Sequence, residues 1–425
     1  MLPPLSPSTT RLSGPVTPNP DRPRILVVVN VYRPDLGGGV LFTDLCEGLA
    51  ERGLDVTVRC AVPYYPEWTD KEDKNGLRIH EWTEGGVRIQ RFGLYIPSNP
   101  NSLIQRLIYE ASFFLSLMRR PIKKGEFDAI MVFCPLVGAV GYAGLNARSR
   151  KIPLWLNVQD LSAQAAAAGG IGGPTSILEK VQNALFRKAE FWSSISPPMI
   201  QALERVPGAP ETVALIPNWM HRSLARHLSG ASAKPAPPPD RPIHLLYSGN
   251  IGGKQHLLPF CKRLAEVDAS FQLRIHGAGS RANEIADWIT VTGDARFEMA
   301  PLTDEAGLAR ALAWADAYVI TEKPGAGSSF IPSKLIPGMT SATPILAVCD
   351  PDGPLGQEVA QNGIGFMAGW DDPDALKRFF DLLASSPEEH ASWSRNALQR
   401  STFYDRDRAI DRCVTAFENL MRSHD

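Results

Sequence analysis

The 425-residue sequence is poor in the features that define several protein classes. Its formal net charge is only -1, from 44 Lys and Arg against 45 Asp and Glu, so the overall charge gives no reason to expect nucleic acid as a partner. The six cysteines include no Cys-x-x-Cys pair, which argues against a zinc site or disulfide framework and favours a reducing, cytoplasmic compartment. The order Gly-x-Gly-x-x-Gly is also missing, which lowers the expectation of a dinucleotide dehydrogenase.

Apolar runs of the length and pattern needed for a membrane span or a signal peptide are also scarce. The first 22 residues are rich in Pro, Ser and Thr, and we interpret 1–22 as a disordered tail. The stretch 129–145 is apolar throughout, but Pro135 divides it into a β-branched half and a Gly/Ala half. A buried strand followed by a covered helix explains this stretch better than a span does.

Short apolar runs alternate with segments of helical periodicity from Arg24 onward, apart from an irregular excursion at 63–86. This alternation predicts an α/β protein with parallel sheets covered by helices on both faces. The chain is too long for one ordinary core, and its clearest linker is the Ala-, Pro- and Ser-rich stretch 229–242. The sequence therefore predicts two doubly wound domains, at 23–228 and 243–404.

Four glycine-rich loops follow predicted strands and precede predicted helices. In open α/β sheets the ligand lies beyond the carboxyl ends of the strands, so these loops are candidate phosphate sites. The last loop feeds a helix predicted to start near Pro332, with Ser333 and Lys334 in its first turn. The four loops are RPDLGGGV at 33–40, SGNIGGKQ at 248–255, HGAGS at 276–280 and EKPGAGSSFIPSKL at 322–335.

The order of these motifs resembles glycosyltransferase family four of the GT-B fold, most of all the branch found in exopolysaccharide and colanic-acid-type gene clusters. The resemblance runs from about Arg24 to about Ser401 and rests on RILVVVNVYRPDLGGGV, LWLNVQD, SISPPMI, LIPNW, LLYSGNIGGKQ, LRIHGAGS and FIPSKLIPGMTSATPILAV. It implies two Rossmann-like domains facing each other across a cleft. It also implies a final helix, 405–425, that crosses back to the N-terminal domain.

The resemblance further implies a retaining hexosyltransferase that needs neither a metal nor another cofactor. Such an enzyme moves a sugar from a UDP- or GDP-sugar to a lipid-linked or oligosaccharide acceptor during extracellular or capsular polysaccharide biosynthesis. The N-terminal half would hold the acceptor and the C-terminal half the nucleotide. Lys254 is a candidate catalytic residue, because a fixed positive charge stabilises a diphosphate leaving group. The candidate donor-binding residues are Gly38, Gly39, Gly249, Asn250, Lys254, Gly277, Gly279, Met299, Glu322, Ser333 and Lys334.

The sequence departs from the family pattern at several positions. A Glu-x7-Glu element common in the family would fall on Ser329 and Pro337, so both carboxylates are missing. Asn157 stands where related sequences often have His, and Asn250 where Arg is common. Asp160 is a candidate catalytic residue that either orients an acceptor hydroxyl or caps a turn. Two alternatives stay open: a catalytically degenerate nucleotide-binding homologue, and a GT-B-type nucleotide-sugar epimerase.

The segment 102–124 combines a helical apolar face with a cluster of basic residues at its end, Arg119, Arg120, Lys123 and Lys124. It fits peripheral contact with the cytoplasmic face of the inner membrane, which would suit a lipid-linked acceptor. It also fits an ordinary core-facing amphipathic helix with a solvated end, which is the simpler interpretation.

Overall fold

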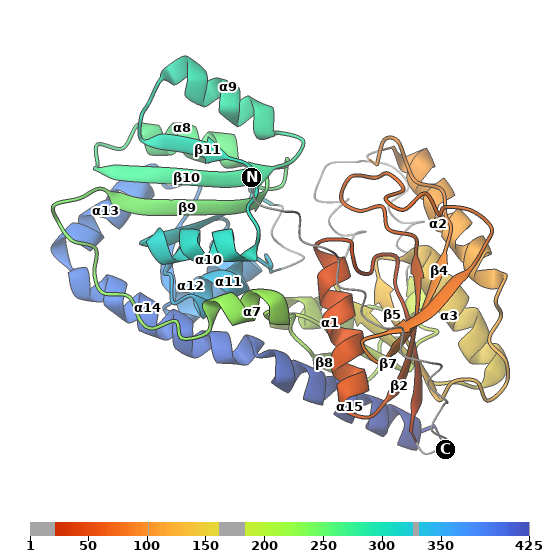
Figure 1. Ribbon diagram of the computed structural model, residues 1–425. Coiled ribbons are helices and arrows are strands. Elements are labelled where there is room, and N and C mark those ends of the chain that lie inside the picture. Colours follow the sequence, from red (N-terminus) through yellow and green to blue (C-terminus); the bar gives the residue numbers. More distant parts are fainter. Residues whose placement is uncertain (1–21, 101, 161–182, 326–330, 425) are drawn as a thin grey trace, which may run out of the picture. The chain divides into compact units, whose positions relative to one another are not determined.

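The structure is a computed structural model that describes residues 22–100, 102–160, 183–325 and 331–424. The chain divides into two compact units, residues 1–155 with 417–425 and residues 156–416 (Figure 1). The predicted tail lies outside the described residues, apart from Arg22. The domain boundaries placed at 229–242 and at 404 remain predictions.

The first sheet has the order β3-β4-β2-β1-β5-β6-β7-β8. β3 pairs antiparallel with β4, whereas β4, β2, β1 and β5 run parallel. β3 lies inside the stretch that looked irregular from the sequence, because an edge strand with polar residues on both faces has no clear apolar alternation. The strands are β1 (Arg24–Val28), β2 (Asp55–Ala61), β3 (His80–Glu84), β4 (Val87–Phe92), β5 (Ala129–Cys134), β6 (Leu154–Val158), β7 (Phe191–Ser194) and β8 (Val213–Leu215).

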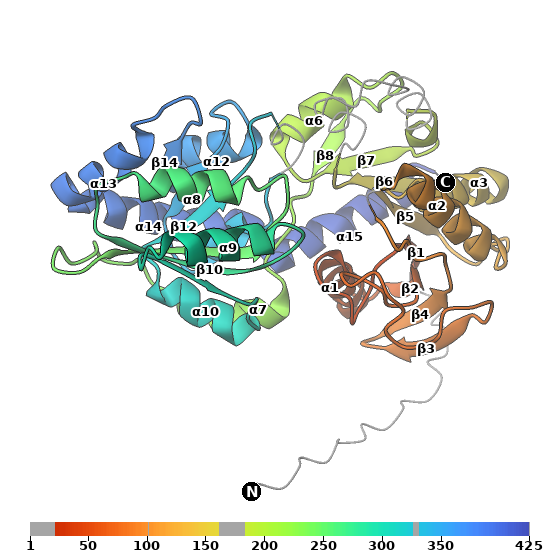
Figure 2. The same ribbon diagram turned by 90° about the horizontal axis from the view of Figure 1, so that it is seen from above.

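Helices cover both faces of the part of this sheet that lies in the first unit. α1 (Gly38–Glu51) lies on one face, and α2 (Leu103–Met118) and α3 (Val137–Arg150) pack side by side on the other (Figures 1 and 2). The apolar stretch 129–145 thus forms β5 and the first half of α3, as predicted. Across the described residues, every helix is too short or too polar to cross a bilayer.

α2 and α3 approach each other closely at Gly138. A Cβ atom at Gly138 would lie 2.4 Å from the Glu110 carbonyl oxygen. The Gly138 amide, in the first turn of α3, donates to the Glu110 carboxylate at 2.8 Å. Burial raises the pKa of Glu110 to about 7, although this hydrogen bond opposes the shift. The carboxylate therefore satisfies an amide of the first turn of α3 at the cost of its own desolvation.

The second sheet has the order β11-β10-β9-β12-β13-β14, and all its pairs run parallel. The chain runs outward from β9 to β10 and β11, then returns to the other side of β9 for β12, β13 and β14. The strand order therefore reverses between β9 and β12. The strands are β9 (Ile243–Asn250), β10 (Phe271–Ala278), β11 (Phe297–Ala300), β12 (Ala317–Thr321), β13 (Ile345–Val348) and β14 (Gly365–Ala368).

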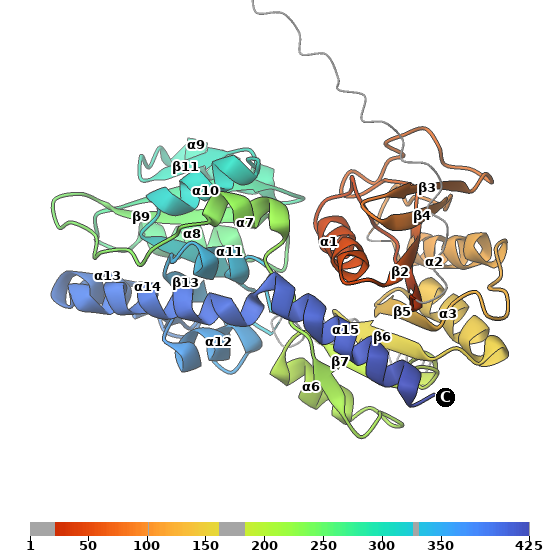
Figure 3. The ribbon, with the colours of Figure 1, turned by 60° about the horizontal axis from the view of Figure 1, so that its bottom comes forward.

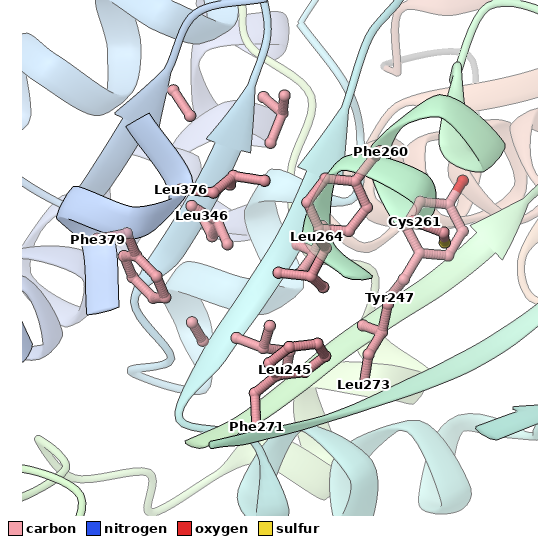
Figure 4. Close-up of a cluster of buried hydrophobic side chains, with 14 of the residues drawn as sticks. Leu245, Tyr247, Phe260, Cys261, Leu264, Phe271, Leu273, Leu346, Leu376 and Phe379 are labelled. Atoms are coloured by element: carbon pink, nitrogen blue, oxygen red, sulfur yellow. The ribbon is translucent and has the colours of Figure 1, made fainter. Parts of the chain in front are cut away.

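Two hydrophobic clusters lie on the two faces of this sheet, because successive side chains of a strand point to opposite faces. Leu245 and Tyr247 pack with α8, α9 and α13 on one face (Figure 4), whereas Leu246 packs with α7, α10, α11 and α12 on the other. α14 runs along α11 (Figure 3). The described helices that follow β7 in the chain are α6 (Pro197–Glu204), α7 (Arg222–Leu228), α8 (Leu257–Ala265), α9 (Ala282–Thr292), α10 (Glu305–Trp314), α11 (Leu335–Thr340), α12 (Pro354–Asn362), α13 (Ala375–Ser385), α14 (Pro387–Ser401) and α15 (Arg406–Arg422).

The proline-rich stretch 229–242 is fastened to the second unit. The Lys234 amide donates to the Ser394 hydroxyl at 2.6 Å, and its ammonium donates to the carbonyl of Ala315 at 2.6 Å. Arg241 pairs with Asp316 at 2.6 Å. α7, just before this stretch, packs into the hydrophobic cluster that contains Leu246. The segment has the composition of a spacer, but Lys234 and Arg241 bond it to the rest of the second unit, of which it forms part.

Candidate functional site

Three of the predicted loops meet where the strand order of the second sheet reverses. Gly249 on β9 is the register partner of Gly277 on β10, and Asn250 is the partner of Ala278. β12 pairs with β9 on its other side and is followed at once by Glu322. In doubly wound sheets this reversal point, at the carboxyl ends of the strands, is where ligands bind. The fold thus brings residues from separate motifs to one edge of one sheet.

Backbone contacts hold these loops together. The Arg281 amide donates to the Ile251 carbonyl at 3.0 Å, and the Lys323 amide donates to the Lys254 carbonyl at 2.8 Å. Gly279 has φ 144, and a Cβ atom there would lie 2.5 Å from the same Ile251 carbonyl oxygen. Glycine at this position is therefore required by the packing of one loop on another, whether or not a ligand is bound.

A cavity of about 550 Å³ opens beside these loops. Three of its lining residues carry positive charge, Lys254, Arg281 and Lys323, and only Lys254 had been selected from the sequence. Among the described residues of the lining, Glu284 is the acidic one, and it pairs with Arg281 at 3.1 Å. The lining consists of Ile251, Gly252, Gly253, Lys254, His256, Leu257, Leu258, Pro259, Arg281, Glu284, Ile285, Lys323, Pro324 and Gly325.

The pKa of His256 is lowered by the positive charges around this cavity. It lies just before α8 in the left-handed conformation, and its ring contacts Trp370 with 4.9 Å between ring centres. Burial lowers the pKa of His256, and the nearby charges of Lys323 and Arg281 lower it further. An anionic ligand would relieve this repulsion, so the cavity suits a phosphate group.

A half-buried lysine packs against the β9 loop. The Lys334 ammonium donates to the Tyr247 hydroxyl at 2.6 Å and lies 3.8 Å from the centre of its ring. The Tyr247 hydroxyl in turn donates to the Asn250 carbonyl at 2.5 Å. A Cβ atom at Gly249 would lie 2.8 Å from the Lys334 Cε atom. The side chain of Lys334 therefore packs under the turn that is predicted to contact the donor.

Burial sets the protonation of this lysine and of the neighbouring glutamate. It lowers the pKa of Lys334 to about 7, although the nearby charge of Glu322 opposes the shift. Glu322 is only 5% exposed, and burial, assisted by the charge of Asp350, raises its pKa to about 7. Its Oε1 atom has no hydrogen-bond partner among the described residues. Glu322 thus presents a buried carboxylate oxygen with unused bonding capacity at the end of β12.

The prediction for the helix near Pro332 was wrong in one respect. α11 begins at Leu335, so Pro332, Ser333 and Lys334 precede the helix and do not form its first turn. The Leu335 amide donates to the Pro332 carbonyl, and the next amide donates to the Ser333 carbonyl, in two tight i to i−3 bonds. These bonds use the amides of Leu335 and Ile336, and the donor-binding role of Ser333 and Lys334 stays a prediction. Ser333 itself is exposed.

Two further predicted positions lie elsewhere in the second unit. Met299 is half-buried on β11, where its register partner is Ile275 of β10. Asp160 is half-buried just after β6, and the chain that follows it, 161–182, lies outside the described residues. Asn157, in the place where relatives often carry His, donates to the Ser193 hydroxyl at 2.9 Å.

Gly38 and Gly39, from the first glycine-rich loop, open α1 in the first unit. Asp35, two residues before this glycine run, was missed by the sequence analysis. It is 1% exposed and accepts hydrogen bonds from the Tyr64 and Tyr65 amides at 3.1 and 2.9 Å. A Cβ atom at Gly39 would lie 2.9 Å from its Cβ atom. The signal available in the sequence was a lone Asp between a strand and a glycine run.

Metal ligands are not gathered in the part of the chain that the structure describes: it contains no group of three His, Cys, Asp or Glu side chains placed to hold an ion. Buried thiols account for all six cysteines.

Solved glycosyltransferases share this architecture. Sucrose-phosphate synthase from Thermosynechococcus elongatus aligns over 95% of this chain and 100% of its own, with a TM-score of 0.70 and 17% identity. HepE from Anabaena, solved with UDP and glucose, aligns over 94% of this chain and 100% of its own, with a TM-score of 0.64 and 14% identity. The protein therefore has the GT-B fold, with two Rossmann-like sheets.

Sequence comparison shows which glycosyltransferases the chain resembles. Residues 37–219 match the family model described as glycosyl transferase 4-like domain. The colanic acid biosynthesis glycosyl transferase WcaI of Escherichia coli strain K12 is 28% identical over 331 residues, which cover 73% of this chain and 80% of WcaI. The chain is thus similar in sequence to transferases of glycosyltransferase family four.

Proposed function

We propose that this protein is a retaining hexosyltransferase that uses a UDP- or GDP-sugar as its donor. Its acceptor is a lipid-linked or oligosaccharide molecule, and its product enters an extracellular or capsular polysaccharide. The observation that carries the proposal is the cationic cavity at the strand-order reversal of the second sheet, lined by Lys254, Arg281 and Lys323.

The cavity supports a nucleotide-sugar donor on physical grounds. The leaving group in such a transfer is a nucleoside diphosphate, whose negative charge grows as the bond to the sugar breaks. Fixed cations placed around that charge stabilise the transition state more than the ground state. Lys254, Arg281 and Lys323 come from three loops tied together by backbone hydrogen bonds, so little reorganisation is needed at the moment of reaction.

Glu322 is the proposed replacement for part of the missing Glu-x7-Glu element. Its buried carboxylate has an oxygen without a partner in the described structure, which suits a sugar or ribose hydroxyl. Because burial raises its pKa to about 7, it can bond such a hydroxyl either as an acceptor or, when protonated, as a donor. Gly249, Asn250, Gly277 and Gly279 would form the wall of backbone beside it.

The rest of the proposal comes from the family and from related proteins. Retention of stereochemistry and independence from metal follow the family pattern. HepE was solved with UDP and glucose, and WcaI is named for colanic acid biosynthesis, which supports a nucleotide-sugar donor and a role in polysaccharide assembly. The acceptor is assigned to the N-terminal half of the sequence, with Asp160 as the candidate residue that orients or deprotonates its hydroxyl, and the site of action is assigned to the cytoplasm. Gly38 and Gly39 stay candidate donor-binding residues.

A thermal-shift panel tests the donor site. UDP, GDP, ADP and their sugars are added to the wild type, to Lys254→Ala and to Lys262→Ala. Lys262 is an exposed lysine of α8 outside the cavity lining, so its variant is the matched control. A ligand at a hundred times its Kd stabilises the folded state by about 2.7 kcal/mol. We expect one nucleotide class to raise the melting temperature of the wild type and the control but not of Lys254→Ala.

Turnover then separates the alternatives. Transfer that needs an added acceptor, persists in EDTA and keeps the anomeric configuration supports the full proposal. Conversion of the donor sugar without any acceptor indicates an epimerase. Binding without turnover over a broad acceptor panel indicates a degenerate homologue. If no nucleotide shifts the melting temperature of well-folded protein, the donor site is wrongly assigned.

A further inference from the structure

The outward side of α2 is unusually apolar. Five large aliphatic side chains on this helix are exposed to solvent by 45% to 70%, and together we call them the α2 outer face. They are Leu103, Ile104, Leu107, Ile108 and Leu115. Exposed apolar residues are ordinarily scattered singly over a surface, so five on one 16-residue helix require an explanation.

The opposite side of α2 already supplies what the core needs. Tyr109, Phe113 and Leu117 are buried there, next to α3 and the first sheet. A surface helix is expected to be polar on its outward side, and a helix that is apolar all round is normally covered. The simpler interpretation offered by the sequence, a core-facing helix with a solvated end, therefore accounts for only half of α2.

The charges of the segment are arranged around this face. Within 102–124 there are five basic residues and a single acidic one, in a chain whose overall net charge is -1. The acidic residue is Glu110, which is half-buried and whose carboxylate accepts the hydrogen bond from the Gly138 amide of α3. Arg106 is exposed near the start of the helix, and the five side chains of the outer face are all aliphatic.

Four further basic residues follow α2 in the sequence. Arg119, Lys123 and Lys124 are exposed, whereas Arg120 pairs with Glu81 at 2.8 Å. An aliphatic face with cations at its border is the pattern of a helix that lies in the plane of a membrane interface. α2 is about 24 Å long at 1.5 Å per residue, and it is not a candidate to cross a bilayer.

We propose that the α2 outer face docks on a lipid leaflet with anionic headgroups. The five aliphatic side chains enter the boundary between headgroups and acyl chains, and Arg106, Arg119, Lys123 and Lys124 meet the anionic headgroups. The excess of cations at the border favours an anionic bilayer over a second copy of this chain, which would bring the same cations together. The docking does not depend on transfer activity, so it stands apart from the proposed function.

Vesicle co-sedimentation of the full chain tests the proposal. Vesicles of phosphatidylcholine mixed with phosphatidylglycerol are compared with vesicles of phosphatidylcholine alone. We expect Ile104→Gln with Leu107→Gln to weaken binding to the mixed vesicles at least tenfold, because burial of each aliphatic side chain is worth about that factor. The matched control is Leu77→Gln with Val291→Gln, at positions 82% and 85% exposed outside α2, and it should bind as the wild type does.

A second pair of variants tests the charges. Lys123→Gln with Lys124→Gln should weaken binding about thirtyfold at low ionic strength, since each cation near an anionic surface contributes roughly a factor of five. Lys188→Gln with Lys262→Gln makes the same change of charge at exposed positions in the second unit and should have little effect. Added salt should weaken wild-type binding in the same direction.

The possible results are clear-cut. The proposal is overturned if the wild type binds the mixed vesicles no better than the neutral ones, or if the control pairs lose as much binding as the α2 pairs. It is also overturned if the wild type ignores vesicles but forms a dimer in ultracentrifugation that Ile104→Gln with Leu107→Gln disrupts. Melting temperatures and nucleotide-induced shifts of all variants should match the wild type, which shows that both the fold and the donor site are intact.

Discussion

Replacing Lys334 by Met should change how the stability of the protein depends on pH. Methionine keeps the length of the side chain over Tyr247 and under Gly249 but removes the ammonium. The pKa of Lys334 is lowered from 10.5 to about 7 in the folded protein. Between these values the unfolded chain binds more protons than the folded one, so the wild type gains stability as pH rises above about 7. Below pH about 7 the folded protein bears the full free-energy cost of a desolvated Lys334 ammonium, and this cost disappears as the ammonium loses its proton.

The magnitude follows from one proton. A single group contributes at most about 1.4 kcal/mol of unfolding free energy per pH unit, which corresponds to roughly 3–5 °C in melting temperature for a domain of this size. We expect Lys334→Met to lose this slope between pH about 7 and about 9, while Lys262→Met keeps it. Differential scanning calorimetry over that range measures both. Equal slopes in Lys334→Met and wild type would refute the assignment of a lowered pKa to Lys334.

Three further outcomes are expected. Glu110→Gln should raise the melting temperature more above pH about 7 than near pH about 5. The glutamine side chain still accepts the hydrogen bond from α3, but it removes the cost of burying a charged carboxylate, which the wild type bears only above the unfolded-state pKa of 4.5. Equal effects at both pH values would contradict this. Gly279→Ala should destabilise the second unit by about 1–3 kcal/mol in urea unfolding, because its φ of 144 disfavours a side chain and its Cβ atom meets a carbonyl oxygen. Arg281→Gln with Lys323→Gln should raise the pKa of His256 in an NMR titration, because both cations lower it, and an unchanged value would remove the evidence for a positive field.

The sequence predicted the strands and helices of both sheets well, because buried parallel strands and amphipathic helices have distinct periods. It also identified the loops that meet at the reversal point, since glycine-rich turns after strands stand out. β3 escaped because its residues HEWTE have no apolar alternation. α7 escaped because only two of its seven residues, Leu224 and Leu228, are buried.

The candidate site was predicted less completely, for reasons of geometry. Arg281 and Lys323 are ordinary cations in the sequence and acquire a role only because the loops of β10 and β12 meet beside that of β9. Lys334 belonged to a motif suggestive of phosphate, yet its side chain packs beneath Gly249. The direction of a lysine side chain depends on tertiary contacts that no local pattern contains. Tertiary contacts also decide which side of α2 is exposed, because the sequence is apolar on both sides of this helix.

The fastening of 229–242 affects how the protein can be divided for engineering. A fragment that starts at Ile243, where the second sheet begins, would leave behind the bonds that Lys234 makes to Ser394 and to the carbonyl of Ala315. It would also leave out α7, and so uncover part of the hydrophobic cluster that contains Leu246. An expression fragment of the second sheet, a chimera with a related transferase, or a split-protein reporter should therefore be joined upstream of Met220. The proline-rich composition of 229–242 suggests a flexible linker at which the chain could be divided. The contacts of Lys234 show instead that this stretch belongs with the second sheet.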